Sequence, residues 1–148
     1  MDEFRKAMPA MVRHEGTWEG IYRHVDRDGT LADQHHMRTL CEFPHDGPYA
    51  YIQHNWLRWD DGRTAERSFP GIFRDGLLWW DTDRFAGHGW ETDGGIVMLR
   101  LDRKDEPGVR FTEMIELSDD GRTRARTWQW FRDGVPFRRT LCDEWRVD

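Results

Sequence analysis

The stretch VRFTEMIELSDDGRTRARTWQWF, residues 109–131, decides the fold class. Its first part, 109–117, alternates apolar and polar residues with a period of two, which is typical of a β-strand with one buried face. The second part, 123–131, also alternates with a period of two, and Asp120-Gly121 lies between the two parts. Because Asp-Gly favours the positive backbone angles of a tight hairpin turn, we predict two antiparallel strands joined at residues 120–121.

The same turn signal recurs along the whole chain. Asp-Gly occurs seven times, at 28–29, 46–47, 61–62, 75–76, 93–94, 120–121 and 133–134. Helical periodicity is confined to residues 2–12, where Pro9 interrupts it. Sequential strands with short connections favour an up-and-down meander, and closure removes its exposed edges. We therefore predict an all-β fold, a single up-and-down antiparallel β-barrel of about ten strands that forms one domain over 1–148, with 1–15 as a short N-terminal helix or lead-in.

Composition excludes several classes of protein. The formal charge of −6 disfavours a sequence-independent nucleic-acid binder, which needs a basic surface. The sequence contains no run of 18 apolar residues, the length needed to span a membrane. The first residues lack a secretory signal, so we expect a cytoplasmic protein. Barrel closure would place one strand between Cys41 and Cys142, too far apart for a disulfide, so both are expected as thiols.

Gly16-Thr17-Trp18 resembles the G-x-W signature that opens the first strand of lipocalins and related calycins. The turn-rich remainder is similar to uncharacterised bacterial calycin-like domains. This resemblance implies a closed barrel that binds a small, mostly apolar molecule, a short helix before the motif and a basic residue, here Arg146, packed over Trp18. The form Gly-Thr-Trp-x-Gly is also similar to nitrobindin-type haem barrels, whose axial ligand is a histidine near the C-terminus. The last histidine here is His88, which argues against a haem. No cofactor is predicted.

Turn geometry predicts which side chains share a face. Asp120-Gly121 places Glu113 opposite Trp128 and Ile115 opposite Arg126 on an apolar, inward face. Asp133-Gly134 places Trp128 opposite Arg139, which adds Arg139 to that face. Inward charges are costly unless they are paired or wetted, so two hypotheses stay open. These charges form either a structural ion network or a cavity with chemistry in it.

A two-residue turn at Asp28-Gly29 likewise places Tyr22 opposite His35, with His24 on the same inward face. For residues 49–82, turn geometry does not decide which of the two strand faces points into the barrel. We assign the more apolar face inward, with Ile52, His54, Trp56, Phe69, Gly71, Phe73, Leu78 and Trp80. If that assignment is inverted, Tyr51, Gln53 and Asn55 become a polar lining.

Seven histidines occur without H-x-H, H-E-x-x-H or C-x-x-C spacing, so no metal site is predicted. A site assembled from distant strands stays open. His35 and His36 are adjacent on a strand and point to opposite faces, which prevents joint ligation. We expect His14, His36, His45 and His88 to face solvent on the strands.

Two functional hypotheses follow. The first is a barrel whose Trp-lined cavity binds an apolar or aromatic ligand with an anionic or phenolic head. Its ligand-binding candidates are Arg139, Arg126, Trp128, Trp130, Trp80, Trp56, Tyr51, Gln53 and Asn55. The alternative is a cofactor-independent lyase, decarboxylase, isomerase or cyclase acting by acid-base catalysis in the same cavity. Its catalytic candidates are Glu113, His54, Tyr22, His35 and His24. A homodimer stays open under both hypotheses.

Overall fold

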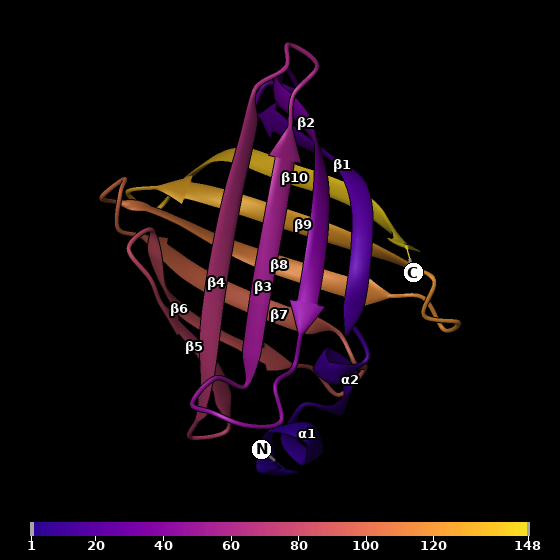
Figure 1. Ribbon diagram of the computed structural model, residues 1–148. Coiled ribbons are helices and arrows are strands. Elements are labelled where there is room, and N and C mark those ends of the chain that lie inside the picture. Colours follow the sequence, from indigo (N-terminus) through magenta and orange to yellow (C-terminus); the bar gives the residue numbers. More distant parts are fainter. Residues whose placement is uncertain (1, 148) are drawn as a thin grey trace.

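The computed structural model, which describes residues 2–147, closes ten antiparallel strands into a barrel (Figure 1). The strands are β1 Gly16–Asp26, β2 Leu31–Glu42, β3 Tyr51–Arg58, β4 Thr64–Arg74, β5 Leu77–Asp81, β6 Phe85–Glu91, β7 Val97–Arg103, β8 Val109–Leu117, β9 Thr123–Arg132 and β10 Val135–Val147. Each strand pairs with its sequence neighbours, and β1 pairs with β10 to complete the ring. The predicted fold class is confirmed.

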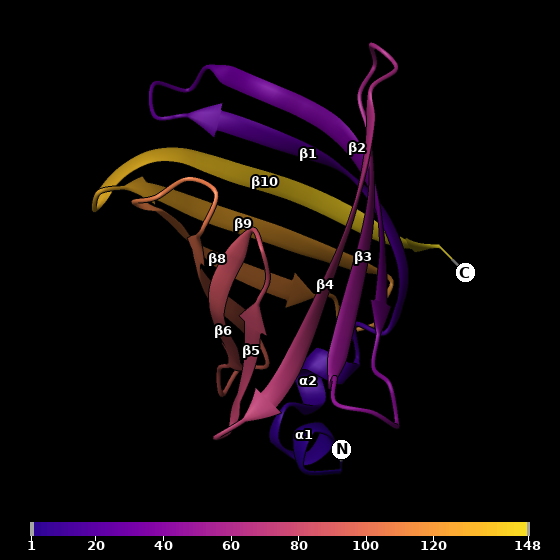
Figure 2. The ribbon, with the colours of Figure 1, turned by 60° about the vertical axis from the view of Figure 1, so that its left-hand side comes forward.

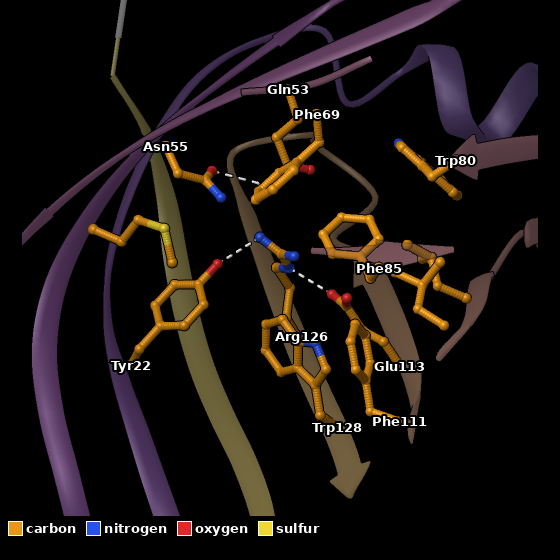
Figure 3. Close-up of a pocket in the computed structure, with 13 residues that line it drawn as sticks. Tyr22, Gln53, Asn55, Phe69, Trp80, Phe85, Phe111, Glu113, Arg126 and Trp128 are labelled. Carbon is orange, nitrogen blue, oxygen red and sulfur yellow. Dashed lines mark hydrogen bonds and ion pairs between the residues drawn. The ribbon is translucent and has the colours of Figure 1, made fainter. Parts of the chain in front are cut away.

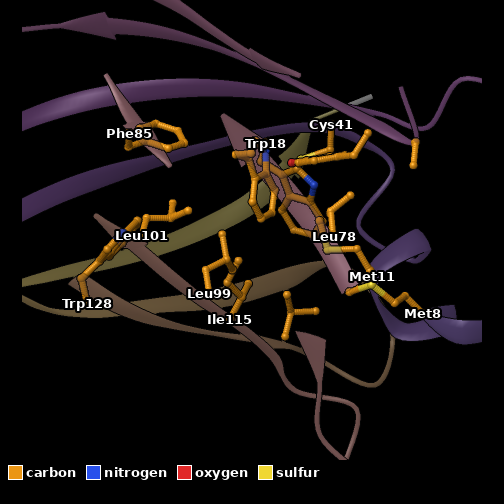
Figure 4. Packing of buried hydrophobic residues seen from close by; sticks show 14 of the residues in the cluster. Met8, Met11, Trp18, Cys41, Leu78, Phe85, Leu99, Leu101, Ile115 and Trp128 are labelled. Atoms are coloured by element: carbon orange, nitrogen blue, oxygen red, sulfur yellow. The ribbon is translucent and has the colours of Figure 1, made fainter. Parts of the chain in front are cut away.

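Two short helices, α1 Asp2–Ala7 and α2 Pro9–Val12, close one end of the barrel (Figure 2). The chain changes direction at Met8 because Pro9 cannot continue the first helix. Phe4 and Met8 are each 1% exposed, and Phe4 stacks on Phe43 with ring centroids 5.9 Å apart. Figure 4 shows Met8 and Met11 beside Leu78 inside the barrel. The buried apolar side chains of the two helices therefore fill this end, and the cavity lies toward the other.

Trp18 and Arg146 join the first and last strands at the closed end. The indole is fully buried, and its Nε1 donates to the His14 carbonyl at 2.9 Å. The Arg146 guanidinium lies 4.3 Å from the ring centroid and donates to the Arg13 and Gly121 carbonyls. The Arg146 position implied by the calycin resemblance is thus observed.

The Asp-Gly turns fall into different classes. Only Asp75-Gly76 and Asp133-Gly134 have positive φ at both residues, as a type I′ turn requires. At Asp61-Gly62 the loop is three residues long, because the Trp59 N–H donates to the Arg63 carbonyl. One type of dipeptide therefore forms loops of different lengths, and loop length sets the register.

The inward assignment of the third strand was wrong. The three-residue loop pairs Gln53 with Phe69 and Tyr51 with Gly71, a shift of one residue from the two-residue turn. Such a shift exchanges the two faces. His54 and Trp56 therefore lie outside the barrel, where His54 Nε2 pairs with Glu42 at 2.9 Å and Trp56 is 38% exposed. For β4 and β5 the assignment was right: Gly71 pairs with Trp80 as predicted.

The inward placement of Arg139 was also wrong. The turn at Asp133-Gly134 forms as predicted, but a bulge between Pro136 and Arg138 shifts the register of β10. Thr140, rather than Arg139, then pairs with Trp128 and is buried, while Arg139 is exposed outside.

Cys41 on β2 and Cys142 on β10 are free and buried, with β1 between their strands. Within residues 2–147 neither helix is long or apolar enough to cross a bilayer.

We predict that Arg146→Ala lowers the free energy of unfolding by about 2–3 kcal/mol, because it removes the cation over Trp18 and the donors to loop carbonyls. Arg146→Lys should recover part of the loss, since one ammonium replaces a planar fork. Urea unfolding measures both. Arg100→Ala, at an exposed position on β7, is the control; equal effects of Arg146→Ala and Arg100→Ala would contradict the structural role.

Candidate functional site

The barrel interior is hollow toward the end away from the helices, where two adjoining chambers form a cavity. The inner chamber has a volume of about 120 Å³ and the outer about 230 Å³. Both are lined by Tyr22, Met37, Asn55, Phe69, Phe85, Phe111 and Trp128. The inner chamber adds Gln53, Trp80, Leu99, Leu101, Glu113 and Arg126. The outer adds His24, His35, Leu57, Arg67, Arg84, Arg103, Trp130 and Thr140.

An ion pair forms part of the inner wall (Figure 3). Arg126 Nε donates to Glu113 Oε2 at 2.7 Å, and Arg126 Nη1 donates to the Tyr22 hydroxyl. Burial raises the pKa of Glu113, and the adjacent Arg126 guanidinium opposes that rise. Burial likewise raises the pKa of Tyr22, so the phenol carries its proton at neutral pH. The cavity thus exposes a carboxyl and a phenol that share one guanidinium.

A second buried pair lies nearer the helices. Arg124 Nε donates to Glu144 Oε1 at 2.8 Å, and its Nη1 contacts His14 Nδ1 at 3.2 Å. Burial, followed by the charges of Arg124 and other arginines, lowers the pKa of His14 to about 2. His14 is only 2% exposed, so its expected solvent-facing position was wrong.

A chain of amides forms the wall contributed by β3. The Tyr51 hydroxyl donates to Gln53 Oε1 at 2.8 Å, and Gln53 Nε2 donates to Asn55 Oδ1 at 3.0 Å. The Thr39 hydroxyl donates to the same Asn55 oxygen. With its oxygen doubly occupied, Asn55 has its amide nitrogen turned toward the cavity in Figure 3.

Aromatic rings cover much of the remaining wall. Trp128 lies under the Arg126 guanidinium, 4.6 Å from ring centroid to Cζ, and Phe111 contacts Trp130 with centroids 4.6 Å apart. Trp80 closes the inner chamber opposite Gly71, where a Cβ would approach the indole Nε1 to 3.1 Å. The predicted tryptophans of the cavity are therefore present, except for Trp56.

Three arginines line the open side of the outer chamber: Arg67 on β4, Arg84 in the β5–β6 loop and Arg103 at the end of β7. Burial and the positive charges of Arg103 and Arg67 lower the pKa of Arg84. Arg103 pairs with Asp105 at 2.6 Å, whereas Arg84 lies 3.8 Å from that carboxylate. We call these three residues the arginine rim.

Opposite the arginine rim, His24 and His35 line the outer chamber. Asp33 accepts from His35 Nδ1 at 2.9 Å and from Trp59 Nε1 at 2.9 Å. His24 Nδ1 contacts the Thr140 hydroxyl at 2.6 Å. Burial, followed by the neighbouring His35, lowers the pKa of His24 to about 4, so His24 is neutral at pH 7.

The structure gathers most of the predicted residues around one cavity. Those lining it are Tyr22, His24, His35, Gln53, Asn55, Trp80, Glu113, Arg126, Trp128 and Trp130. Tyr51 lies inward and supports Gln53, whereas His54, Trp56 and Arg139 lie outside.

The arginine rim was not predicted. Arg67 lies on the same strand face as Phe69 and Gly71, and Arg103 lies on the same face as Leu99 and Leu101. The alternation of side chains along a strand was therefore enough to predict that both arginines point inward. Arg84 lies in a loop, where alternation gives no information.

Comparisons with known proteins identify the fold. No protein-family model matches the chain, and no curated protein matches its sequence. Among solved structures, a DUF3598-family protein from Nostoc punctiforme PCC 73102 is 17% identical, with a TM-score of 0.72 over 93% of this chain and 49% of its own. The chain thus spans about half the length of that protein.

Two further solved structures superpose along most of both chains. The S-type phycobiliprotein lyase CPES from Guillardia theta is 13% identical, with a TM-score of 0.73 over 93% of this chain and 90% of the lyase. EF1p2_mFAP2b bound to DFHBI is 10% identical, with a TM-score of 0.51 over 95% of this chain and 98% of its own. At these low sequence identities, the three structures share only their fold with this chain. That fold is consistent with the calycin-like barrel expected from the sequence.

We predict that stability falls as the pH drops below the ordinary histidine range, because the unfolded chain binds a proton that buried His14 does not. With its folded pKa at about 2, His14 should contribute about 2 kcal/mol of destabilisation between pH 7 and pH 5. Urea unfolding of His14→Gln at both pH values should show this contribution removed. The exposed His45→Gln control should keep the full pH dependence, and an unchanged slope in His14→Gln would contradict the prediction.

Proposed function

We propose that this chain binds a small, flat, largely apolar molecule that carries an anionic group. The observation that carries the proposal is an aromatic-lined cavity that opens at three arginines, in a chain whose formal charge is −6. Ligand cavities in proteins are mostly apolar, with a few polar groups that fix orientation.

The body of the ligand would lie between aromatic side chains. Trp128, Phe111 and Phe85 line both chambers, so a single flat molecule could contact them along its length. Offset stacking of rings adds about 0.5–1.5 kcal/mol per pair beyond area burial. At the inner end, Asn55 and Tyr22 offer polar contacts to a carbonyl or hydroxyl group.

The acidic head would contact the arginine rim. Guanidinium groups bind carboxylates through two parallel hydrogen bonds, which adds direction to charge attraction. Among the described residues, no carboxylate lies within ion-pair distance of Arg67. We therefore assign the head-group role to the arginine rim rather than to Arg139.

The comparisons support this proposal. EF1p2_mFAP2b was solved with the small molecule DFHBI bound, and CPES is a phycobiliprotein lyase. One related barrel thus accommodates a small molecule, and this chain has a cavity of its own in the same fold.

We expect aromatic and isoprenoid carboxylic acids to quench tryptophan fluorescence saturably, and their methyl esters to bind at least about tenfold more weakly, since the ester lacks the charge. Trp128→Ala and Arg84→Gln should each weaken binding of the acids by about tenfold or more, because one removes stacking area and the other a charge-assisted contact.

The chain offers matched controls for this titration in Trp56→Ala and Arg139→Gln, which change the same residue types outside the barrel. Both should leave affinity unchanged. Equal affinities for acids and esters, or equal losses in inward and outward variants, would overturn the proposal.

A second candidate function is acid-base catalysis on such a ligand. The observation that favours it is Glu113, a carboxyl in the inner wall whose pKa is raised by burial, beside the Tyr22 phenol. A carboxyl with a raised pKa is a better general base near neutral pH. Glu113 would remove a proton from the ligand, and Tyr22 would stabilise the developing negative charge.

If this candidate is right, Glu113→Gln lowers conversion of the bound acid by about 100-fold or more while binding survives, because the base is removed and its shape kept. Tyr22→Phe should lower conversion as well. Mass spectrometry of the added compound over time measures both variants, with circular dichroism to confirm folding. Unchanged conversion in both would exclude these residues, and no conversion by the unmodified chain would leave ligand binding as the function.

A further inference from the structure

Two histidines on neighbouring strands face each other across the wall of the outer chamber. The β1–β2 register pairs Tyr22 with His35 and His24 with Asp33, which places both imidazoles inward. Their ring centroids are 5.6 Å apart. Each of His24, Asp33 and His35 has one atom able to ligate a metal ion within 4.8 Å of such an atom in the other two.

His35 has a buried nitrogen without a partner. Its side chain is 4% exposed, and no hydrogen-bond partner for Nε2 exists among residues 2–147. The Asp33 carboxylate can only accept, so His35 Nδ1 carries the hydrogen of their 2.9 Å bond. In the neutral ring, Nε2 then has a free lone pair. Buried polar atoms of this kind are rare and call for a missing partner.

Asp33 orients the ring and is not free to ligate. One of its oxygens accepts from His35 and the other from Trp59 Nε1 at 2.9 Å. A carboxylate that holds the far nitrogen of a histidine is the usual support of a metal-bound imidazole. Asp33 has this position relative to His35.

His24 presents the same nitrogen. Its Nδ1 lies 2.6 Å from the Thr140 hydroxyl oxygen, which accepts from Trp130 Nε1 at 2.8 Å. That oxygen has a second lone pair to accept from Nδ1–H, and in this tautomer the Nε2 lone pair of His24 is free. The ring is thereby fixed from β10, and Nε2 is the nitrogen left for an external ligand. His24 and His35 therefore each have an oriented ring with Nδ1 engaged.

We propose that His24 and His35 form a binding site for a divalent transition-metal ion such as Zn²⁺, ligated through both Nε2 atoms, with Asp33 as the orienting carboxylate. Imidazole nitrogens at about 2.0–2.1 Å from a tetrahedral Zn²⁺ lie about 3.4 Å apart. The ligand atoms of this cluster lie within 4.8 Å of one another, so the two rings would move closer together when the metal binds. The remaining coordination positions face the cavity and would hold water or an oxygen of a bound molecule. The site does not depend on the arginine rim, so it stands or falls separately from the proposed ligand.

Calorimetric titration of the chelator-treated full chain with ZnCl₂ tests the site. We expect one Zn²⁺ per chain, with at least 100-fold weaker binding in His24→Gln and in His35→Gln. Asp33→Asn should weaken binding by about 10–100-fold, the usual effect of removing an orienting partner. The control His54→Gln removes an outward histidine that pairs with Glu42 and should leave affinity and stoichiometry unchanged.

A spectroscopic readout separates this site from surface binding. Co²⁺ bound by two histidines and two further ligands should give visible absorption bands that disappear in the His24→Gln, His35→Gln double variant. Circular dichroism confirms that the double variant is folded. Retention of Zn²⁺ affinity in the double variant, loss of binding in His54→Gln, or no binding by the unmodified chain would each overturn the proposal. Binding of carboxylic acids by the metal-free chain is measured independently.

Discussion

The ion pair between Arg126 and Glu113 is the interaction on which the barrel interior depends. Two charges removed from water are costly unless they meet at hydrogen-bond distance, and here the contact is 2.7 Å. The guanidinium also donates to Tyr22 and lies over Trp128, so it connects β1, β8 and β9 across the lumen. Removing one partner would leave a buried, unpaired charge, which typically costs about 3–5 kcal/mol. The pair therefore holds three strands together in the wall of the inner chamber.

The sequence was sufficient for the fold class because strand alternation and turn residues are local signals. It was insufficient for register, because Asp-Gly fits loops of two, three or more residues. In the first hairpin the predicted pairs were right since a bulge between His24 and Val25 offsets the longer loop. At β3–β4 no bulge offsets the loop, and in β10 a bulge follows a correctly predicted turn. Each error is one residue, and each exchanges a whole strand face.

The prediction of the site residues was limited in the same way, by strand register. Glu113, Trp128 and Arg126 were placed correctly because they lie beside a turn whose register matches the sequence estimate. Arg139 was misplaced by a single bulge in its own strand, β10. The ion pair between Arg124 and Glu144 could not be predicted either. The same bulge places Glu144, rather than Asp143, at the inward position opposite Arg124. Long-range pairing, rather than residue type, limited the prediction.

The charges inside the barrel differ in how completely they are neutralised. Arg124 and Arg126 each have a buried carboxylate within 2.8 Å, so the inner wall is balanced and attracts no net counter-charge. At the arginine rim, Arg84 shares Asp105 with Arg103 at the longer distance of 3.8 Å, and burial and repulsion by its neighbours outweigh that carboxylate. An anion entering an acidic protein would therefore meet favourable potential at the arginine rim rather than at the ion pair below. Beside this balanced pair, the inner chamber is lined by the amide groups of Gln53 and Asn55 and the phenol of Tyr22.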